Sequence, residues 1–239
     1  MSRETTSLSL EAVVVLCMTF LWFSFNVARS QPRVSIPKPT LTLDTVYQGQ
    51  PLAALIPIRN SGQDNLLIRS VSPSCDCTTI RHAPTAIAPN HLDTIRVTIN
   101  TSGLRGTEEK QVFVQTNDRS TPIAAIRLRF TVVTEVEPAD GEYNLWLGSV
   151  PVGTTLRKSV SFRNVSGVPL AICGVSTASP ELVFTFQPRI IQPGQKGDAD
   201  FSLTPSHEGV SRSEVVFSFS GGHQRVMALT VTCVGSRPR

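Results

Sequence analysis

The chain contains one pattern twice, the copies being offset by 104 residues, and this repeat constrains its fold more than any other feature. Aligning residues 41–117 with residues 145–221 without a gap gives seventeen identical positions, whereas unrelated segments would share only a handful. The repeat predicts two domains of about 100 residues, a size that buries a core without metal or disulfide help. The identical positions include Leu41/Leu145, Leu43/Leu147, Gly49/Gly153, Leu52/Leu156, Arg59/Arg163, Asn60/Asn164, Ile68/Ile172, Pro89/Pro193 and Phe113/Phe217.

Strand patterns dominate both copies. Residues 94–99, 126–132 and 225–231 alternate apolar and polar side chains, as half-buried strands do. β-Branched and aromatic residues fill 111–114 and 215–219, and no stretch after the N-terminal segment has helical periodicity. The pattern predicts an all-β chain of two tandem immunoglobulin-like β-sandwiches with about seven strands each.

Matched turns separate these strands in both copies. Asn and Gly tolerate the left-handed backbone that a reversal of chain direction needs, and Pro starts many turns. The residues expected to form structural turns are Asn60, Gly62 and Pro89 in the first copy, and Asn164, Gly167 and Pro193 in the second.

Composition along the chain sets the expected boundaries. We predict a first domain at 39–133 and a second at 143–235. Residues 134–142 between them are polar and acidic and contain Pro and Gly, which is typical of a linker. Because this segment is short, the domains are expected to lie end to end with limited freedom.

Residues 1–30 belong to neither copy. The apolar run from Ala12 to Phe25 is shorter than the roughly 20 residues of a membrane helix and fits the core of a signal peptide. Ala28-Arg29-Ser30 provides a cleavage site, and Cys17 is read as apolar filler. The segment therefore predicts export to the periplasm, the cell envelope or the outer surface.

An uncleaved anchor at residues 12–28 is the alternative, because Glu4 and Glu11 remove the usual positive charge before the apolar run. Membrane contact is then expected only through this segment.

Charge is distributed unevenly between the copies. Residues 31–134 hold eleven Lys/Arg and seven Asp/Glu, whereas 135–239 hold nine of each. A basic first domain, with Arg127 and Arg129 on one predicted strand face, offers a third and weaker hypothesis of glycan or anionic-surface binding. Nucleic-acid binding is not expected, because basic and aromatic residues do not cluster together.

The first copy resembles a known family through the order of its motifs. Residues 41 to about 132 resemble the bacterial domain-of-unknown-function 1573 family, whose exported members are common in the Bacteroidetes. This resemblance implies a relationship to the immunoglobulin-like set that includes the major-sperm-protein and centrosome/cilium-associated domains. The motifs are Gly49, Ile58-Arg59-Asn60-Ser61-Gly62, Leu66-Leu67-Ile68, Ser74-Cys75-Asp76-Cys77-Thr78 and Ile87-Ala88-Pro89. The second copy has Ser179 and Glu181 in place of the cysteines.

Cys75 and Cys77 are the sharpest candidate site. In a regular strand their Cα atoms would lie ~6.6 Å apart, at the limit of a disulfide, whereas a turn would bring them closer. They are expected to be packing thiols or a structural bridge; a redox-active disulfide is one alternative. Binding of Cu(I), with His82 or His91 as a further ligand, is the other, and no other cofactor is expected.

Other residues point to no enzymatic chemistry. A bridge between Cys173 and Cys233 is disfavoured, because strand parity points them in opposite directions. The histidines, His207 and His223 among them, fall in predicted loops without a metal-like spacing. Thr45 and Thr94 follow aspartates and precede aliphatic residues, a pattern similar to O-glycosylation sites of Bacteroidetes envelope proteins.

The leading hypothesis is thus a non-enzymatic binding or structural protein of the cell envelope, with an envelope protein or glycan as its unidentified partner. A thiol-redox or copper-handling module centred on Cys75 and Cys77 is the alternative.

Overall fold

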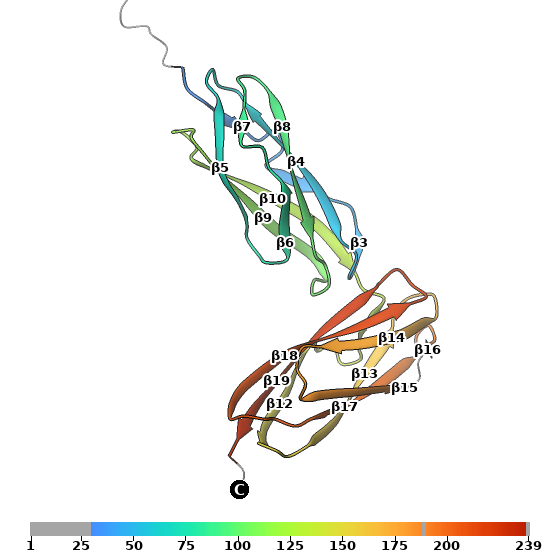
Figure 1. The fold of residues 1–239 in the computed structure, drawn as a ribbon. Coiled ribbons are helices and arrows are strands. Elements are labelled where there is room, and N and C mark those ends of the chain that lie inside the picture. Colours follow the sequence, from blue (N-terminus) through green and yellow to red (C-terminus); the bar gives the residue numbers. More distant parts are fainter. Residues whose placement is uncertain (1–29, 188–189, 238–239) are drawn as a thin grey trace, which may run out of the picture.

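The computed structural model describes residues 30–187 and 190–237. These residues form strands and connecting turns without any helix, so no helix among them is long and apolar enough to cross a membrane. The strands build two successive sandwiches, one from each copy (Figure 1). The predicted signal or anchor segment, with Cys17, lies outside the described residues apart from Ser30.

The first sandwich pairs a four-stranded sheet with a larger one. The smaller sheet has the order β1-β4-β8-β6, and the larger has β2-β10-β9-β5-β7, with β3 also paired to β10. Strands β2 and β3 run parallel to β10, and the other pairs are antiparallel. The strands are β1 Val34–Ser35, β2 Thr40–Thr42, β3 Val46–Tyr47, β4 Leu52–Asn60, β5 Leu66–Pro73, β6 Thr78–His82, β7 Ala86–Ile87, β8 Leu92–Ile99, β9 Gly106–Thr116 and β10 Ile123–Val133.

The second sandwich repeats this topology. Its sheets have the orders β11-β13-β17-β15 and β12-β19-β18-β14-β16, with β12 parallel to β19. Each strand takes the place of its counterpart in the first copy, so the sequence repeat is also a structural one. The strands are β11 Val136–Pro138, β12 Asn144–Pro151, β13 Leu156–Asn164, β14 Leu170–Thr177, β15 Leu182–Gln187, β16 Ile190–Ile191, β17 Lys196–Leu203, β18 Gly209–Ser220 and β19 Val226–Ser236.

Alternation of side chains explains how each sandwich closes. In β10, Ala124, Ile126, Leu128 and Phe130 are buried while the residues between them face outwards. In the second core the rings of Phe162 and Phe217 meet edge to face at 4.7 Å between centroids. Burial of these apolar faces, at about 25 cal/mol per Å², is the main force holding the sheets together.

The structure contains more strands than the predicted seven per copy, because very short strands lie at the sheet edges. It also places β1 and β11 outside the expected domain ranges 39–133 and 143–235. Strand β11 lies inside the segment predicted as a linker, 134–142, yet it pairs with β13 as part of the second sandwich. Its Pro138 and acidic residues resemble a loop in sequence, but an edge strand tolerates them.

The matched turns after β7 and β16 have the same geometry. The N–H of His91 donates to the carbonyl of Ala88 at 3.1 Å, and that of Gln195 donates to Gln192 at 2.9 Å. The residue after each proline has a positive φ, 61° for Asn90 and 75° for Gly194. Pro89 and Pro193 therefore occupy the first central position of a turn that needs Asn or Gly at the second.

We expect Gly194→Ala to lower the stability of the second sandwich by about 1 kcal/mol, because alanine is strained at this positive φ. The matched change Gly167→Ala should have a smaller effect, since Gly167 lacks a positive φ and a Cβ there meets nothing within 4 Å. Urea denaturation of both variants checks this, and equal losses would contradict it.

Candidate functional site

Cys75 and Cys77 form a disulfide in the turn between β5 and β6. Their Cα atoms are 5.2 Å apart, closer than a regular strand would place them, because the chain turns here. Both residues are half-buried, and their sulfurs lie 3.6 and 3.8 Å from the hydroxyl of Thr78. The pair is thus a bridge in this structure, one of the arrangements that the sequence left open.

The histidines do not complete this site. His82 and His91 are exposed, and neither is a described hydrogen-bond partner of the bridged sulfurs. Among the residues that the structure describes, no group of three or more His, Cys, Asp or Glu is placed to hold a metal ion. Two sulfurs bonded to each other are not thiolates, so Cu(I) binding at Cys75 and Cys77 would first require reduction.

In the second copy, hydrogen bonds rather than a disulfide stabilise the equivalent turn. The carbonyl of Glu181 accepts a hydrogen bond from Thr204 at 3.1 Å, as that of Cys77 does from Asn100 at 2.7 Å. Instead of a disulfide, the Glu181 carboxylate accepts hydrogen bonds from the N–H and hydroxyl of Ser206. These bonds lower the pKa of Glu181, and the neighbouring His207 contributes in the same direction.

This carboxylate should make stability depend on pH. A folded-state pKa below the unfolded value adds stability above the ordinary carboxyl pKa, and that stability is lost as pH falls through the folded value. Glu181→Gln is therefore expected to lower the thermal midpoint slightly at neutral pH, and the difference should shrink as the pH falls below the ordinary pKa of a carboxyl group. A difference that persists unchanged in acid would contradict this assignment.

The remaining described cysteines are free and differ in exposure. Cys173 is exposed in β14 and lies 3.0 Å from the hydroxyl of Ser220, whereas Cys233 is buried in β19. They form no bridge with each other, as strand parity predicted. Burial raises the pKa of the Cys233 thiol, which makes it less reactive.

We expect maleimide to modify Cys173 in the folded chain and Cys233 only after unfolding. Mass spectrometry of tryptic peptides checks this, because it locates the label. Labelling of both thiols at the same rate under native conditions would contradict the assigned burial.

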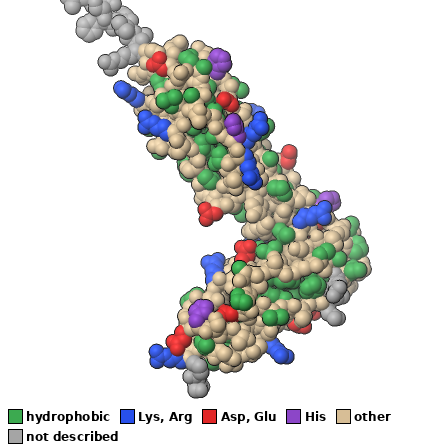
Figure 2. All heavy atoms as spheres, viewed as in Figure 1, with side chains coloured by type: hydrophobic (Ala, Val, Ile, Leu, Met, Phe, Trp, Pro, Cys, Tyr) green, Lys and Arg blue, Asp and Glu red, His purple; other side chains and the backbone are tan. Residues whose placement is uncertain are grey.

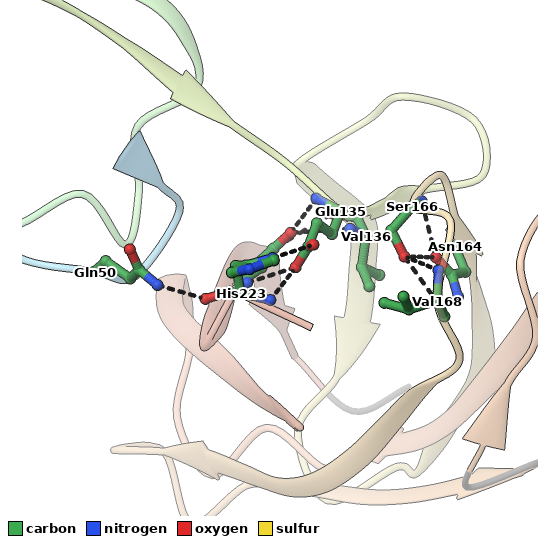
Figure 3. Close-up of polar contacts among 8 residues, drawn as sticks. Gln50, Glu135, Val136, Asn164, Ser166, Val168 and His223 are labelled. Atoms are coloured by element: carbon green, nitrogen blue, oxygen red, sulfur yellow. Dashed lines mark hydrogen bonds and ion pairs between the residues drawn. The ribbon is translucent and has the colours of Figure 1, made fainter. Parts of the chain in front are cut away.

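Asn60 and Asn164 do more than form turns, since each is fully buried at the end of its strand. The amide group of Asn164 donates to the carbonyl of Val168 at 2.7 Å (Figure 3). It also donates to the carbonyl of Ile191 at 2.8 Å. Its oxygen accepts from the main-chain N–H of Ser166 at 2.9 Å. Asn60 makes the equivalent bonds to the first copy's turn and to Ile87.

The predicted glycines of these turns have unequal roles. A Cβ on Gly62 would lie 2.5 Å from the main-chain nitrogen of Arg33, so no larger residue fits. Gly167 aligns with Gln63 rather than with Gly62, and a Cβ on Gly167 would meet nothing within 4 Å.

A polar network lies at the junction between the sandwiches. We call it the junction network, and it consists of the buried residues Gln48, Glu135 and Gln224 and the exposed His223. Glu135 is only 6% exposed, and its carboxylate accepts the main-chain N–H groups of His223 and Gln224, each at 2.6 Å (Figure 3). The Nδ1 atom of His223 lies 3.2 Å from the same carboxylate. The side-chain oxygen of Gln224 accepts the N–H groups of Glu135 and Val136 in return.

This network extends across the domain boundary. The Gln224 amide donates to the side-chain oxygen of Gln48 at 2.8 Å, and the ring of His223 stacks on Tyr47 at 4.4 Å between centroids. Arg105 of the first sandwich lies 4.1 Å above the ring of Tyr143, whose pKa is raised by burial. Sequence reasoning missed these contacts, because they join residues far apart in the chain.

Close packing accompanies the polar contacts at this boundary. A Cβ on Gly49 would lie 2.8 Å from the main-chain nitrogen of Val226, so the repeated glycine is required here for contact between sandwiches. Its counterpart Gly153 has the same positive φ but open space around it.

The arginines and threonines that the sequence suggested as surface sites differ in how exposed they are. Arg127 and Arg129 are exposed, but both are paired with Glu109, at 3.6 and 2.6 Å, which reduces the positive charge of that face. Positive side chains are scattered over the face shown in Figure 2. Thr45 is exposed before β3, whereas Thr94 is half-buried in the interior strand β8.

Two sandwiches of this topology define an all-β protein with tandem immunoglobulin-like domains. The family described as protein of unknown function (DUF1573) matches residues 34–132, which make up most of the first sandwich, as the motifs of the first copy predicted. The second sandwich lies outside the match. A search of the curated proteins found no match.

Solved structures with similar chains share little sequence. A protein of unknown function from Porphyromonas gingivalis W83 is 12% identical, and the match covers 84% of this chain and 99% of that one with a TM-score of 0.37. The ASH/PapD-like domain 7 of human CEP192 is 9% identical over 44% of this chain and 87% of that one, with a TM-score of 0.37. The two-domain DIP-gamma IG1+IG2 is 11% identical over 87% and 99%, with a TM-score of 0.31.

Proposed function

We propose that the chain is a non-enzymatic binding or structural module of the cell envelope, in which two immunoglobulin-like domains act as one unit. The observation that carries this proposal is the junction network. The buried Glu135 carboxylate accepts hydrogen bonds from the loop between β18 and β19 of the second sandwich, which offset the cost of burying its charge. That loop contacts the first sandwich, because Gln224 donates to Gln48 and the ring of His223 stacks on Tyr47. A coupled pair presents its loops and sheet edges in a constant arrangement, which suits recognition of a partner.

Export of the chain is part of this proposal. It is supported by the apolar segment before Ser30 and by the Cys75–Cys77 disulfide, because disulfides persist in oxidising compartments. The partner is then an envelope protein or glycan.

In-cell cross-linking followed by affinity capture tests the proposal directly. The full-length chain should recover the same envelope component in repeated captures, and a variant with an uncoupled junction, Glu135→Ala, should recover less of it. Recovery of nothing beyond an unrelated exported control would reject the binding role. Turnover of a substrate that a point substitution abolishes would reject the non-enzymatic assignment.

The alternative, a thiol-redox or copper-handling module, is favoured by one observation, the half-buried bridge between Cys75 and Cys77. On reduction the disulfide would accept two electrons and two protons from a dithiol, which becomes oxidised. Intact-mass measurement should show a gain of two hydrogens after mild reduction, and then a Cu(I) adduct that Cys75→Ser removes. A mass that stays unchanged after reduction and after addition of Cu(I) would contradict this alternative.

A further inference from the structure

The two copies differ most at one free sheet edge. Strands β6 and β15 occupy the same place, at the end of each four-stranded sheet. Strand β6 carries Arg81 and His82, and its register with β8 shifts between Ile80 and His82. Charged side chains and bulges are the means by which sheets avoid pairing with other edges.

Strand β15 has neither protection. It reads Leu-Val-Phe-Thr-Phe-Gln without a charge, and its pairing with β17 continues from Leu182 to Gln187 without a register shift. Val183, on the outer face, is 61% exposed. Thr185 and Phe186 stand where the first copy has Arg81 and His82, so the second copy has lost the residues that protect this edge.

The hydrogen-bond pattern shows which main-chain groups face outwards. The N–H of Thr204 donates to the carbonyl of Glu181, which makes these residues a hydrogen-bonded pair. Such pairs alternate along an antiparallel ladder, so Val183 and Thr185 also direct their main-chain groups towards β17. The main-chain groups of Phe184 and Phe186 therefore point to the free edge. On β6 the same alternation leaves Thr78 and Ile80 before the bulge, and the N–H of Thr78 already donates to the carbonyl of Cys75.

Strand β15 is also fixed in an extended conformation by its contacts with the core. The ring of Phe184 lies 5.5 Å from that of Phe201 and 5.7 Å from that of Phe217, between centroids, which fixes β15 on the core. A strand already in its bound conformation loses little conformational entropy when another strand pairs with it.

We infer that β15 is a pairing edge for a second copy of this chain, with the two strands antiparallel about a two-fold axis at Thr185. In this register Phe184 of each copy pairs with Phe186 of the other, using the outward main-chain groups, and Thr185 faces Thr185. Aromatic and Thr–Thr cross-strand pairs are favourable, and an uncharged strand does not repel itself. This two-fold dimer is a closed assembly, because the β15 edge of each copy is paired with that of the other copy and neither edge is left for a third copy.

Restoring the charge of the first copy tests this inference. Thr185→Arg places a guanidinium where β6 has Arg81, and in the dimer the two guanidiniums would face each other. Sedimentation velocity of the full-length chain in mild detergent should show a dimer for the wild type at concentrations of about 1–100 µM, and at least a tenfold weaker dimer for T185R. Thr154→Arg, which adds the same charge in the turn before β13, should dimerise like the wild type.

A cysteine trap provides a measurement that does not depend on affinity. Facing residues of a non-hydrogen-bonded pair have Cα atoms about 4.5 Å apart, within reach of a disulfide. Thr185→Cys in a Cys173→Ser background should therefore form a cross-linked dimer on oxidation, whereas Thr154→Cys in that background should not. A wild type that stays monomeric throughout, a T185R variant that dimerises equally well, or a monomer that pairs instead with another envelope protein would each overturn the inference.

Discussion

Replacing Asn164 with alanine is expected to lower the free energy of unfolding of the second sandwich by about 3 kcal/mol. The side chain is fully buried and satisfies two carbonyls and one main-chain N–H, which alanine would leave without partners. Leaving buried polar groups unsatisfied costs more than the loss of the bonds themselves. Asn60→Ala should have an effect of similar size on the first sandwich, because its bonds are equivalent.

Urea denaturation followed by circular dichroism measures these losses. Asn144→Ala is the matched control, because Asn144 is exposed at the start of β12 and makes no side-chain hydrogen bond to the described residues. It should stay within about 0.5 kcal/mol of the wild type. An Asn164→Ala variant as stable as this control would show that the buried amide is not required.

Replacing Glu135 with alanine is expected to uncouple the two sandwiches. The change removes the acceptor of the His223 and Gln224 N–H groups, at a cost of about 3 kcal/mol in stability. It also weakens the support of the Gln224 amide that reaches Gln48 in the first sandwich. Small-angle scattering should therefore show a wider distribution of interdomain distances than for the wild type.

Glu137→Ala is the control for this change, because Glu137 lies two residues further on, in the short strand β11, and is outside the junction network. Glu135→Gln should fall between the two, since its amide oxygen still accepts a hydrogen bond. Identical scattering from Glu135→Ala and Glu137→Ala would contradict the assigned role of the carboxylate.

The sequence was sufficient to predict what depends on local pattern. Alternating side chains located strands such as β10, and the repeated Asn60/Asn164 and Pro89/Pro193 located the turns. Both signals act over a few residues, so they are readable without knowledge of the partner strands. The fold class follows from their number and spacing.

Long-range pairing could not be predicted in the same way. Strand β11 is short and contains Pro138, and only its pairing with β13 makes it a strand. The junction network joins Gln48 to Gln224, 176 residues apart, and no local pattern signals such a contact. The buried role of Asn164 was hidden for the same reason, because turn-forming asparagines are usually exposed.

The site was predicted only in part. Cys75 and Cys77 were found by their spacing, but a two-residue separation fits a bridge, free thiols or a metal site equally well. The compensating pair of Glu181 and Ser206 in the second copy gave no signal, because a surface carboxylate and a serine are common everywhere.

The central claim is that the two sandwiches form one unit through the junction network. Residual dipolar couplings of backbone amides measure the orientation of each sandwich independently. Couplings from β4, β8 and β9 and from β13, β17 and β18 should fit a single alignment tensor with one set of orientations. Two tensors of different magnitude would mean that the sandwiches reorient freely, and would contradict the account.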